Sequence, residues 1–253
     1  MIFDPACLAD RLVAVTGASS GIGRETAVML SRCGARLALV GRDKGRLAET
    51  EALLAGRRHS IHVADLDSAD KACDTVLDIA RDRGPIKGIF HAAGMTLVLP
   101  VKMTKDKQLD AVFGANLHGA FGIARAAARH GTVSDGGSLV FMSSSAGRKG
   151  RLALSAYCAA KAAVEGMVRS LAIEFASRHI RVNAIAAGAV ETPMHTRFLS
   201  GVCDEVASDY RAIHPLGFGR PDDVASAAVF LISDGGRWIT GTSLAVDGGA
   251  TAG

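Results

Sequence analysis

Tyrosine is scarce in this chain of 253 residues, which contains only two, Tyr157 and Tyr210. Tyr157 stands four residues before Lys161, in a run that otherwise consists of small side chains, SAYCAAKAA (155–163). Positions four apart lie on one face of a helix, so a phenol and an ammonium would be neighbours there. The pair is either an accident of a surface helix or the working part of a proton donor.

Cysteines are few and scattered, and none forms a CxxC or Cys/His cluster. Their odd number and wide spacing support neither a disulfide framework nor a zinc site, so we expect no metal and reduced thiols in a cytoplasmic protein. The N-terminal segment lacks a signal-peptide pattern, and no apolar run reaches the roughly 18 residues of a membrane span. The five cysteines are Cys7, Cys33, Cys73, Cys158 and Cys203.

A basic cluster is also missing, although the net charge is +4. Nucleic-acid surfaces need a basic patch or stripe, so we expect no nucleic-acid partner, and the scattered charge favours an anionic ligand only weakly. The apolar fraction of 49% is sufficient for a large core.

Short apolar runs alternate with longer helical patterns along the whole chain. Strands are predicted at 11–16, 35–41, 60–65, 86–94, 137–144, 180–188 and 243–249. Helices are predicted at 21–33, 43–55, 69–83, 107–130, 156–177 and 221–233. The alternation predicts one doubly wound α/β domain over residues 1–253, a seven-stranded parallel sheet with helices on both faces. Ligands of such sheets bind beyond the carboxyl ends of the strands.

A glycine-rich turn, TGASSGIGR (16–24), follows the first predicted strand and opens its helix. Glycines allow a tight turn and close backbone approach, and a helix N-terminus presents free N–H groups to a pyrophosphate. We therefore predict dinucleotide contacts from Gly17, Ser19, Ser20, Gly21, Ile22 and Gly23.

The end of the second predicted strand has Gly41 and Arg42 where NAD-binding sites often have a carboxylate. A guanidinium binds a 2′-phosphate that a carboxylate would repel, so NADP(H) is favoured and NAD(H) remains possible. Arg42 is alternatively a solvated surface residue, and Asp43 is expected to cap the next helix. Asp65, followed by Leu66, either receives the adenine amino group or caps a helix.

With TGASSGIG, HAAG, YCAAK and the closing VDGG in this order, the chain resembles the classical short-chain dehydrogenase/reductase family from about Leu8 to Gly249. The resemblance implies a Rossmann fold and a catalytic tetrad of Asn116, Ser144, Tyr157 and Lys161. Ser144 is preferred to its serine neighbours because it stands three residues before Gly147. Hydride transfer to a carbonyl leaves an alkoxide that needs a proton, which Tyr157 would supply.

In this scheme Lys161 and the positive nicotinamide of the oxidised cofactor both lower the pKa of the phenol. Lys161 also reaches the nicotinamide ribose, Ser144 binds the reacting oxygen, and Asn116 holds a water. Taken singly, each residue also has an ordinary structural explanation, such as packing or a loop cap. The family also implies cofactor contacts from two later segments. These are Ala92, Ala93 and Gly94, then Gly188, Val190 and Thr192. HAAG stands where the family more often has NAG, and Ala187 stands where a proline is usual.

The family keeps its substrate lid at about 190–215, which we expect to be irregular. Met194, Phe198, Leu199 and Val202 either cover an apolar substrate there or pack internally, and Met95–Val101 forms the opposing wall. The histidines His91, His195 and His214 are interpreted as structural. The loop GRKGR (147–151) is either solvated or meets a phosphate-bearing thioester.

These features predict an NAD(P)(H)-dependent oxidoreductase that interconverts a ketone and a secondary alcohol. A 3-oxoacyl thioester reductase is the first candidate, although Ile173 replaces an arginine typical of carrier-protein reductases. A sugar, polyol or steroid alcohol dehydrogenase is the alternative, and a silent nucleotide-binding scaffold is the candidate from another class. The family and the small residues of helices 107–130 and 156–177 indicate a homotetramer or dimer.

Overall fold

Seven parallel strands form one sheet in the order β3-β2-β1-β4-β5-β6-β7, which confirms the predicted fold class. The computed structural model describes residues 3–201 and 204–253. The strands are β1 (Leu12–Thr16), β2 (Arg36–Gly41), β3 (Ser60–Val63), β4 (Ile86–His91), β5 (Val133–Ser144), β6 (Arg181–Ala187) and β7 (Ser243–Val246). β1 lies between β2 and β4, so the chain changes direction across the sheet beside β1.

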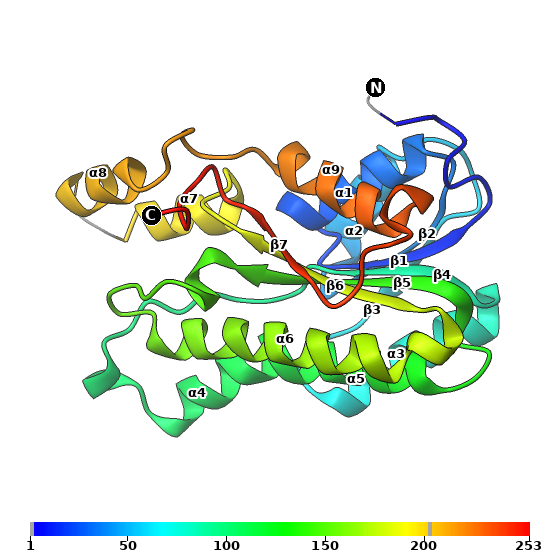
Figure 1. Ribbon diagram of the computed structural model, residues 1–253, viewed down its shortest axis with the longest axis horizontal. Coiled ribbons are helices and arrows are strands. Elements are labelled where there is room, and N and C mark those ends of the chain that lie inside the picture. Colours follow the sequence, from blue (N-terminus) through cyan, green and yellow to red (C-terminus); the bar gives the residue numbers. More distant parts are fainter. Residues whose placement is uncertain (1–2, 202–203) are drawn as a thin grey trace.

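Helices cover both faces of the sheet (Figure 1). One face carries α3 (Ala69–Arg83), α4 (Asp106–Phe113), α5 (Gly119–Ala128) and α6 (Ser155–Glu174). The other carries α1 (Gly21–Arg32), α2 (Lys44–Glu51) and α9 (Pro221–Ile232). On this second side, α7 (Pro193–Leu199) and α8 (Asp204–Ala212) lie together at one end of the molecule (Figure 1).

The core has two layers because successive strand residues point to opposite faces. In β1, Leu12 and Ala14 pack with α3, α5 and α6, whereas Val13 and Val15 pack with α1 and α9. Both faces of each central strand are therefore buried, which explains the continuous apolar runs of the sequence.

The structure departs from the predicted elements in three places. The expected helix 107–130 is divided into α4, a π-helical turn (Gly114–His118) and α5. β5 begins at Val133, and its pairing with β4 shifts register between Ile86 and Gly88. The lid, predicted to be irregular, contains α7 and α8. Thr192 caps α7 with its side chain and Pro193 begins it, two signals that were readable in the sequence.

Asp43 caps α2 by accepting a hydrogen bond from the Arg46 N–H, as predicted. Among the described residues, no helix is long and apolar enough to cross a membrane. Groups of three or more metal-ligating side chains are likewise absent from that part of the chain.

The contact of α3 with α5 depends on Gly122, where an added Cβ would overlap the backbone of Ala69. We expect Gly122→Ala to lower the free energy of unfolding by about 1–3 kcal/mol, the usual cost of forcing extra volume into a packed site. The control is Gly166→Ala on α6, whose Cβ would meet only the Arg169 side chain at 3.8 Å. There alanine should stabilise the helix by about 0.5–1 kcal/mol. Urea denaturation measures the free energy of unfolding of both variants. If the two substitutions changed it in the same direction, the close approach of α3 to Gly122 would not explain the effect.

Candidate active site

The glycine turn between β1 and α1 is a backbone cradle. Gly17 and Gly21 have φ of +65° and +53°, in the left-handed region that favours glycine. A side chain on Gly23 would overlap the carbonyl group of Gly17. Ser20 makes no side-chain cap on α1, so the first N–H groups of that helix are available to a ligand. The turn is therefore suited to an anionic group.

The larger of two neighbouring cavities, about 480 Å³, lies over this turn and reaches the ends of β2 and β3. The predicted cofactor-binding residues that line it are Gly17, Ser19, Ser20, Gly21, Ile22, Gly23, Arg42, Asp65, Leu66, Ala92, Ala93, Gly94 and Thr192. Its lining includes two further arginines, Arg46 and Arg197, that the sequence analysis missed. Arg46 follows Arg42 by four residues, a spacing that was available as a signal.

Arg42 and Asp65 lie next to each other in the lining of this cavity. The Arg42 Nη1 and Asp65 Oδ2 atoms are 3.8 Å apart, and both side chains are largely exposed. Such an ion pair is weak and salt-screened, so the guanidinium remains available to a bound phosphate. Asp65 does not cap the following helix, because Ser68 does so by accepting from the Lys71 N–H.

The smaller cavity, about 170 Å³, brings together all four residues of the predicted tetrad: Asn116, Ser144, Tyr157 and Lys161. Gly188 and Val190, predicted to contact the cofactor, also line it. The two cavities share wall residues, among them Ile22, Gly94 and Thr192. A long ligand in the larger cavity would therefore end beside Tyr157.

Burial sets the acidity of the Tyr157–Lys161 pair. Burial raises the pKa of Tyr157 to about 12, although a hydrogen bond with Ser144 opposes the rise. Burial also lowers the pKa of Lys161 to about 8. The Lys161 Nζ atom donates to the Met142 carbonyl at 2.8 Å and lies 5.7 Å from the centroid of the Tyr157 ring. Desolvation of the phenolate dominates in the chain alone. The lowering of the Tyr157 pKa that was expected from Lys161 together with the positive nicotinamide stays a prediction.

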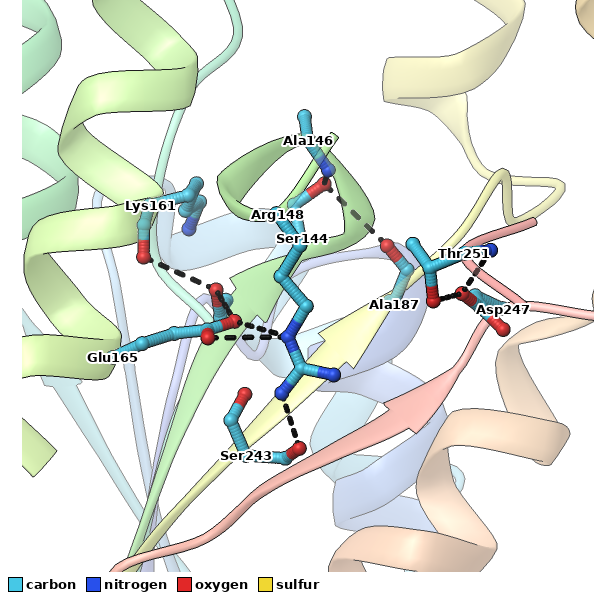
Figure 2. Close-up of polar contacts among 10 residues, drawn as sticks. Ser144, Ala146, Arg148, Lys161, Glu165, Ala187, Ser243, Asp247 and Thr251 are labelled. Atoms are coloured by element: carbon cyan, nitrogen blue, oxygen red, sulfur yellow. Dashed lines mark hydrogen bonds and ion pairs between the residues drawn. The ribbon is translucent and has the colours of Figure 1, made fainter. Parts of the chain in front are cut away.

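Ser144 occupies the carboxyl end of β5. Its Oγ atom accepts a hydrogen bond from the Ala146 N–H at 3.2 Å and donates to the Ala187 carbonyl at 3.4 Å (Figure 2). The neighbouring Ser143 also lines the cavity, but its hydroxyl donates to the Lys161 carbonyl on α6. Ser145 lines the cavity as well, so the choice of Ser144 among the three consecutive serines stays a prediction.

Asn116 lies in the π-helical turn between α4 and α5. Its Nδ2 atom donates to the carbonyls of Met95 and Val112, both at 2.9 Å. Its Oδ1 atom is buried and has no partner among the described residues. π-turns are frequent at functional sites, and this one presents an acceptor to the cavity.

Comparisons with known proteins agree with this geometry. A family model described as "Enoyl-(Acyl carrier protein) reductase" matches residues 17–251. The chain belongs to the short-chain dehydrogenase/reductase family. Carbonyl reductase family member 4 from Danio rerio is 37% identical over 243 residues, which are 94% of this chain and 97% of that protein. The 3-oxoacyl-[acyl-carrier-protein] reductase FabG of Thermotoga maritima is 31% identical, over 96% of this chain and 98% of that protein.

A solved structure from Beutenbergia cavernae, described as an NAD(P)-dependent gluconate 5-dehydrogenase with bound NADP, superimposes with a TM-score of 0.88. It is 33% identical, and the match covers 99% of this chain and all of that one. Short-chain dehydrogenases/reductases are oxidoreductases that act on carbonyl or CH–OH groups with NAD(H) or NADP(H). The chain is therefore an oxidoreductase of this kind, and the likenesses disagree on a substrate.

The lid supplies one wall of the smaller cavity in this short-chain dehydrogenase/reductase. Met194 and Phe198 of α7 line the cavity, whereas Leu199 does not, and Val202 lies outside the described residues. Met95 and Thr96 line it as well, in agreement with the predicted opposing wall. Tyr210 of α8, which was not predicted as a site residue, also lines the cavity, and its ring centroid lies 4.9 Å from that of Phe198.

Two of the three histidines are structural, as predicted. His91 is buried, its Nδ1 atom lies 2.8 Å from the Thr16 hydroxyl, and burial lowers its pKa to about 3. The His214 Nε2 atom accepts from the Ala189 N–H at 3.0 Å. His195 differs, because it lines the smaller cavity.

Arg148 in the loop GRKGR forms an ion pair that the sequence analysis did not foresee. Its Nε atom lies 3.1 Å from both carboxylate oxygens of Glu165, and its Nη2 atom donates to the Ser243 carbonyl (Figure 2). The Ser143 hydroxyl lies 3.0 Å from the same carboxylate. The cluster ties α6, four residues beyond Lys161, to β5 and β7. The interpretation of this loop as simply solvated is therefore wrong for Arg148.

Removing the Arg148 guanidinium would leave Glu165, whose side chain is only 11% exposed, without its cation. We expect Arg148→Met to lower the free energy of unfolding by about 1–3 kcal/mol, the cost of an unsatisfied buried polar group. Adding Glu165→Gln removes the stranded charge, so the double variant should recover part of this loss. A double-mutant cycle by urea denaturation measures the coupling, and purely additive losses would show that the pair does not act as a unit.

Proposed function

We propose that the chain is an NADP(H)-preferring oxidoreductase that reduces a ketone to a secondary alcohol, or catalyses the reverse reaction, with Tyr157 as the proton donor in reduction. The observation that carries this proposal is the junction of the two cavities. A dinucleotide-sized cavity over the glycine turn shares its wall with a smaller one that contains Ser144, Tyr157, Lys161 and Asn116.

The dinucleotide would be held along the carboxyl edge of the sheet. The free N–H groups at the start of α1 suit its pyrophosphate, Asp65 and Leu66 its adenine, and Arg42 with Arg46 a 2′-phosphate. Gly188, Val190 and Thr192, which line the smaller cavity, would contact the nicotinamide carboxamide. A side chain at position 188 would overlap the backbone of Asp247, which explains why this residue is glycine. When bound, the nicotinamide ring supplies or accepts the hydride.

The side chains around the smaller cavity handle the proton. With a pKa of about 12, Tyr157 keeps its proton at neutral pH and is ready to give it to a developing alkoxide. Lys161, with a pKa of about 8, is mostly charged at neutral pH and stabilises the phenolate that remains. Ser144 donates a hydrogen bond to the reacting oxygen, and the buried Oδ1 atom of Asn116 holds a water in the proton path.

A cavity of about 170 Å³ favours a small carbonyl substrate. Ile173, where carrier-protein reductases tend to have arginine, is 80% exposed, which argues against carrier binding at that point. A sugar or polyol dehydrogenase therefore competes with a 3-oxoacyl thioester reductase. We further expect a homotetramer or dimer, since the small residues of α5 and α6 would let helices of a second subunit approach closely. A cytoplasmic location is expected because the four cysteines that the structure describes are free thiols.

Tyr157→Phe tests the proton donor. We expect kcat for ketone reduction to fall by at least about 100-fold, because positioned acids contribute roughly 10²–10⁴ to such rates. NADPH binding, followed by nucleotide fluorescence, should change little because the ring remains. Near wild-type turnover in this variant would overturn the mechanism and revive the silent scaffold as the alternative.

Arg42→Asp tests the cofactor preference. Losing a charge-assisted bond and adding a repulsive carboxylate should shift the ratio of kcat/KM for NADPH over NADH by about 10–100-fold toward NADH. Lys44→Asp is the matched control, since Lys44 is an exposed cation that does not line the cavity. The assignment of Arg42 to the 2′-phosphate fails if both variants move the ratio equally.

A further inference from the structure

The smaller cavity contains a second cation besides Lys161, the guanidinium of Arg151. The Arg151 Nη2 atom is buried and has no hydrogen-bond partner among the residues that the structure describes. A buried N–H group without an acceptor is unfavourable, because its contact with water has been lost and nothing replaces it. Arg151 is therefore placed to bind a group that enters the cavity.

Negative charge is missing from the walls of this cavity. Its described lining residues include no aspartate or glutamate. Lys161 is committed to the Met142 carbonyl and lies beside Tyr157, at the end where the proton is handled. Arg151 is thus a separate positive charge without a carboxylate, and a cavity with charge of one sign attracts ligands of the other.

The other basic residues of the same loop have protein partners. Arg148 is paired with Glu165, and the Lys149 Nζ atom contacts the carbonyl of Gly253. Of these three cations, Arg151 alone lines the cavity within the described structure. Arg151 is therefore part of the cavity wall and not simply one of several solvated charges in a basic loop.

His195 contributes another unused nitrogen. Its Nε2 atom is buried and lacks a partner within the described part of the chain, and the residue lines the same cavity. Burial lowers the pKa of His195, so the ring is neutral at pH 7 and offers one N–H donor. Tyr210 also lines the cavity; burial raises its pKa, and the nearby charge of Arg151 opposes that rise.

We propose that the carbonyl substrate carries an oxyanion, of which a carboxylate is the simplest, and that Arg151 binds this group while the carbonyl lies at Tyr157 and Ser144. The inference rests on the proposed function, since it assigns the two ends of one substrate. A guanidinium pairs with a carboxylate through two parallel hydrogen bonds. Leu154, Met194 and Phe198 line the cavity too, so an apolar chain between the two groups is accommodated.

Matched ketones test this assignment. 4-Oxopentanoate and 5-oxohexanoate are each compared with their methyl esters, with NADPH as the reductant. Wild-type protein should show a higher kcat/KM for the acids. Arg151→Gln should lower the acid-to-ester ratio by about 10–100-fold, as expected for a lost charge-assisted bond. Arg57→Gln removes one charge from an exposed residue before β3, at the opposite edge of the sheet, and should leave the ratio unchanged.

Calorimetric titration of the oxo acids into the NADP⁺-loaded protein gives a readout that does not require turnover. An oxo-phosphonate of equal length identifies the anion: tighter binding than the carboxylate, lost in Arg151→Gln, would assign a phosphate-type group to the same site. Equal binding of acid and ester, or an equal loss of both in Arg151→Gln, would overturn the anion site. Failure to bind NADP(H) would instead contradict the proposed function, and titration of the acids into unloaded protein would still decide the role of Arg151.

Discussion

The register of the parallel sheet determines where the chemistry takes place. β1 pairs with β4 so that Thr16 lies opposite His91, and β5 pairs with β6 so that Ser144 lies opposite Ala187. Since all the strands end at one edge, the glycine turn, Ser144 and the lid segment meet there. A slip of one residue in β5 would turn the Ser144 side chain toward Glu165, to which the Ser143 hydroxyl bonds now.

Burial at this edge shifts the pKa values of Tyr157 and Lys161 in opposite directions. The phenol and the ammonium have similar pKa values in water, near 10. Inside the protein they separate to about 12 for Tyr157 and about 8 for Lys161. Desolvation penalises the charged form of each, so Tyr157 holds its proton more firmly than a free phenol, whereas Lys161 releases its proton more readily than a free amine.

The sheet, its helices and the Tyr157–Lys161 pair were predictable because they depend on local signals: continuous apolar runs, glycine spacing and the i, i+4 pair. Asn116 and Ser144 were predicted from the family resemblance instead. The π-turn around Asn116 was not, since it depends on tertiary contact. Gly114 and Gly119 flank this turn, and any side chain there would overlap the backbone of Asp67 or Leu66. The Arg148–Glu165 pair joins residues 17 apart that only the fold brings together. The raised pKa of Tyr157 likewise required knowledge of burial.

The walls of the smaller cavity come from two kinds of segment. Ser144 and Tyr157 belong to the end of β5 and to α6, which are fixed by the core, whereas Arg151, Met194 and Phe198 belong to a loop and to α7. Substitutions at Arg151, Met194 and Phe198 can therefore change which ligand the cavity selects, while Ser144 and Tyr157 stay in place.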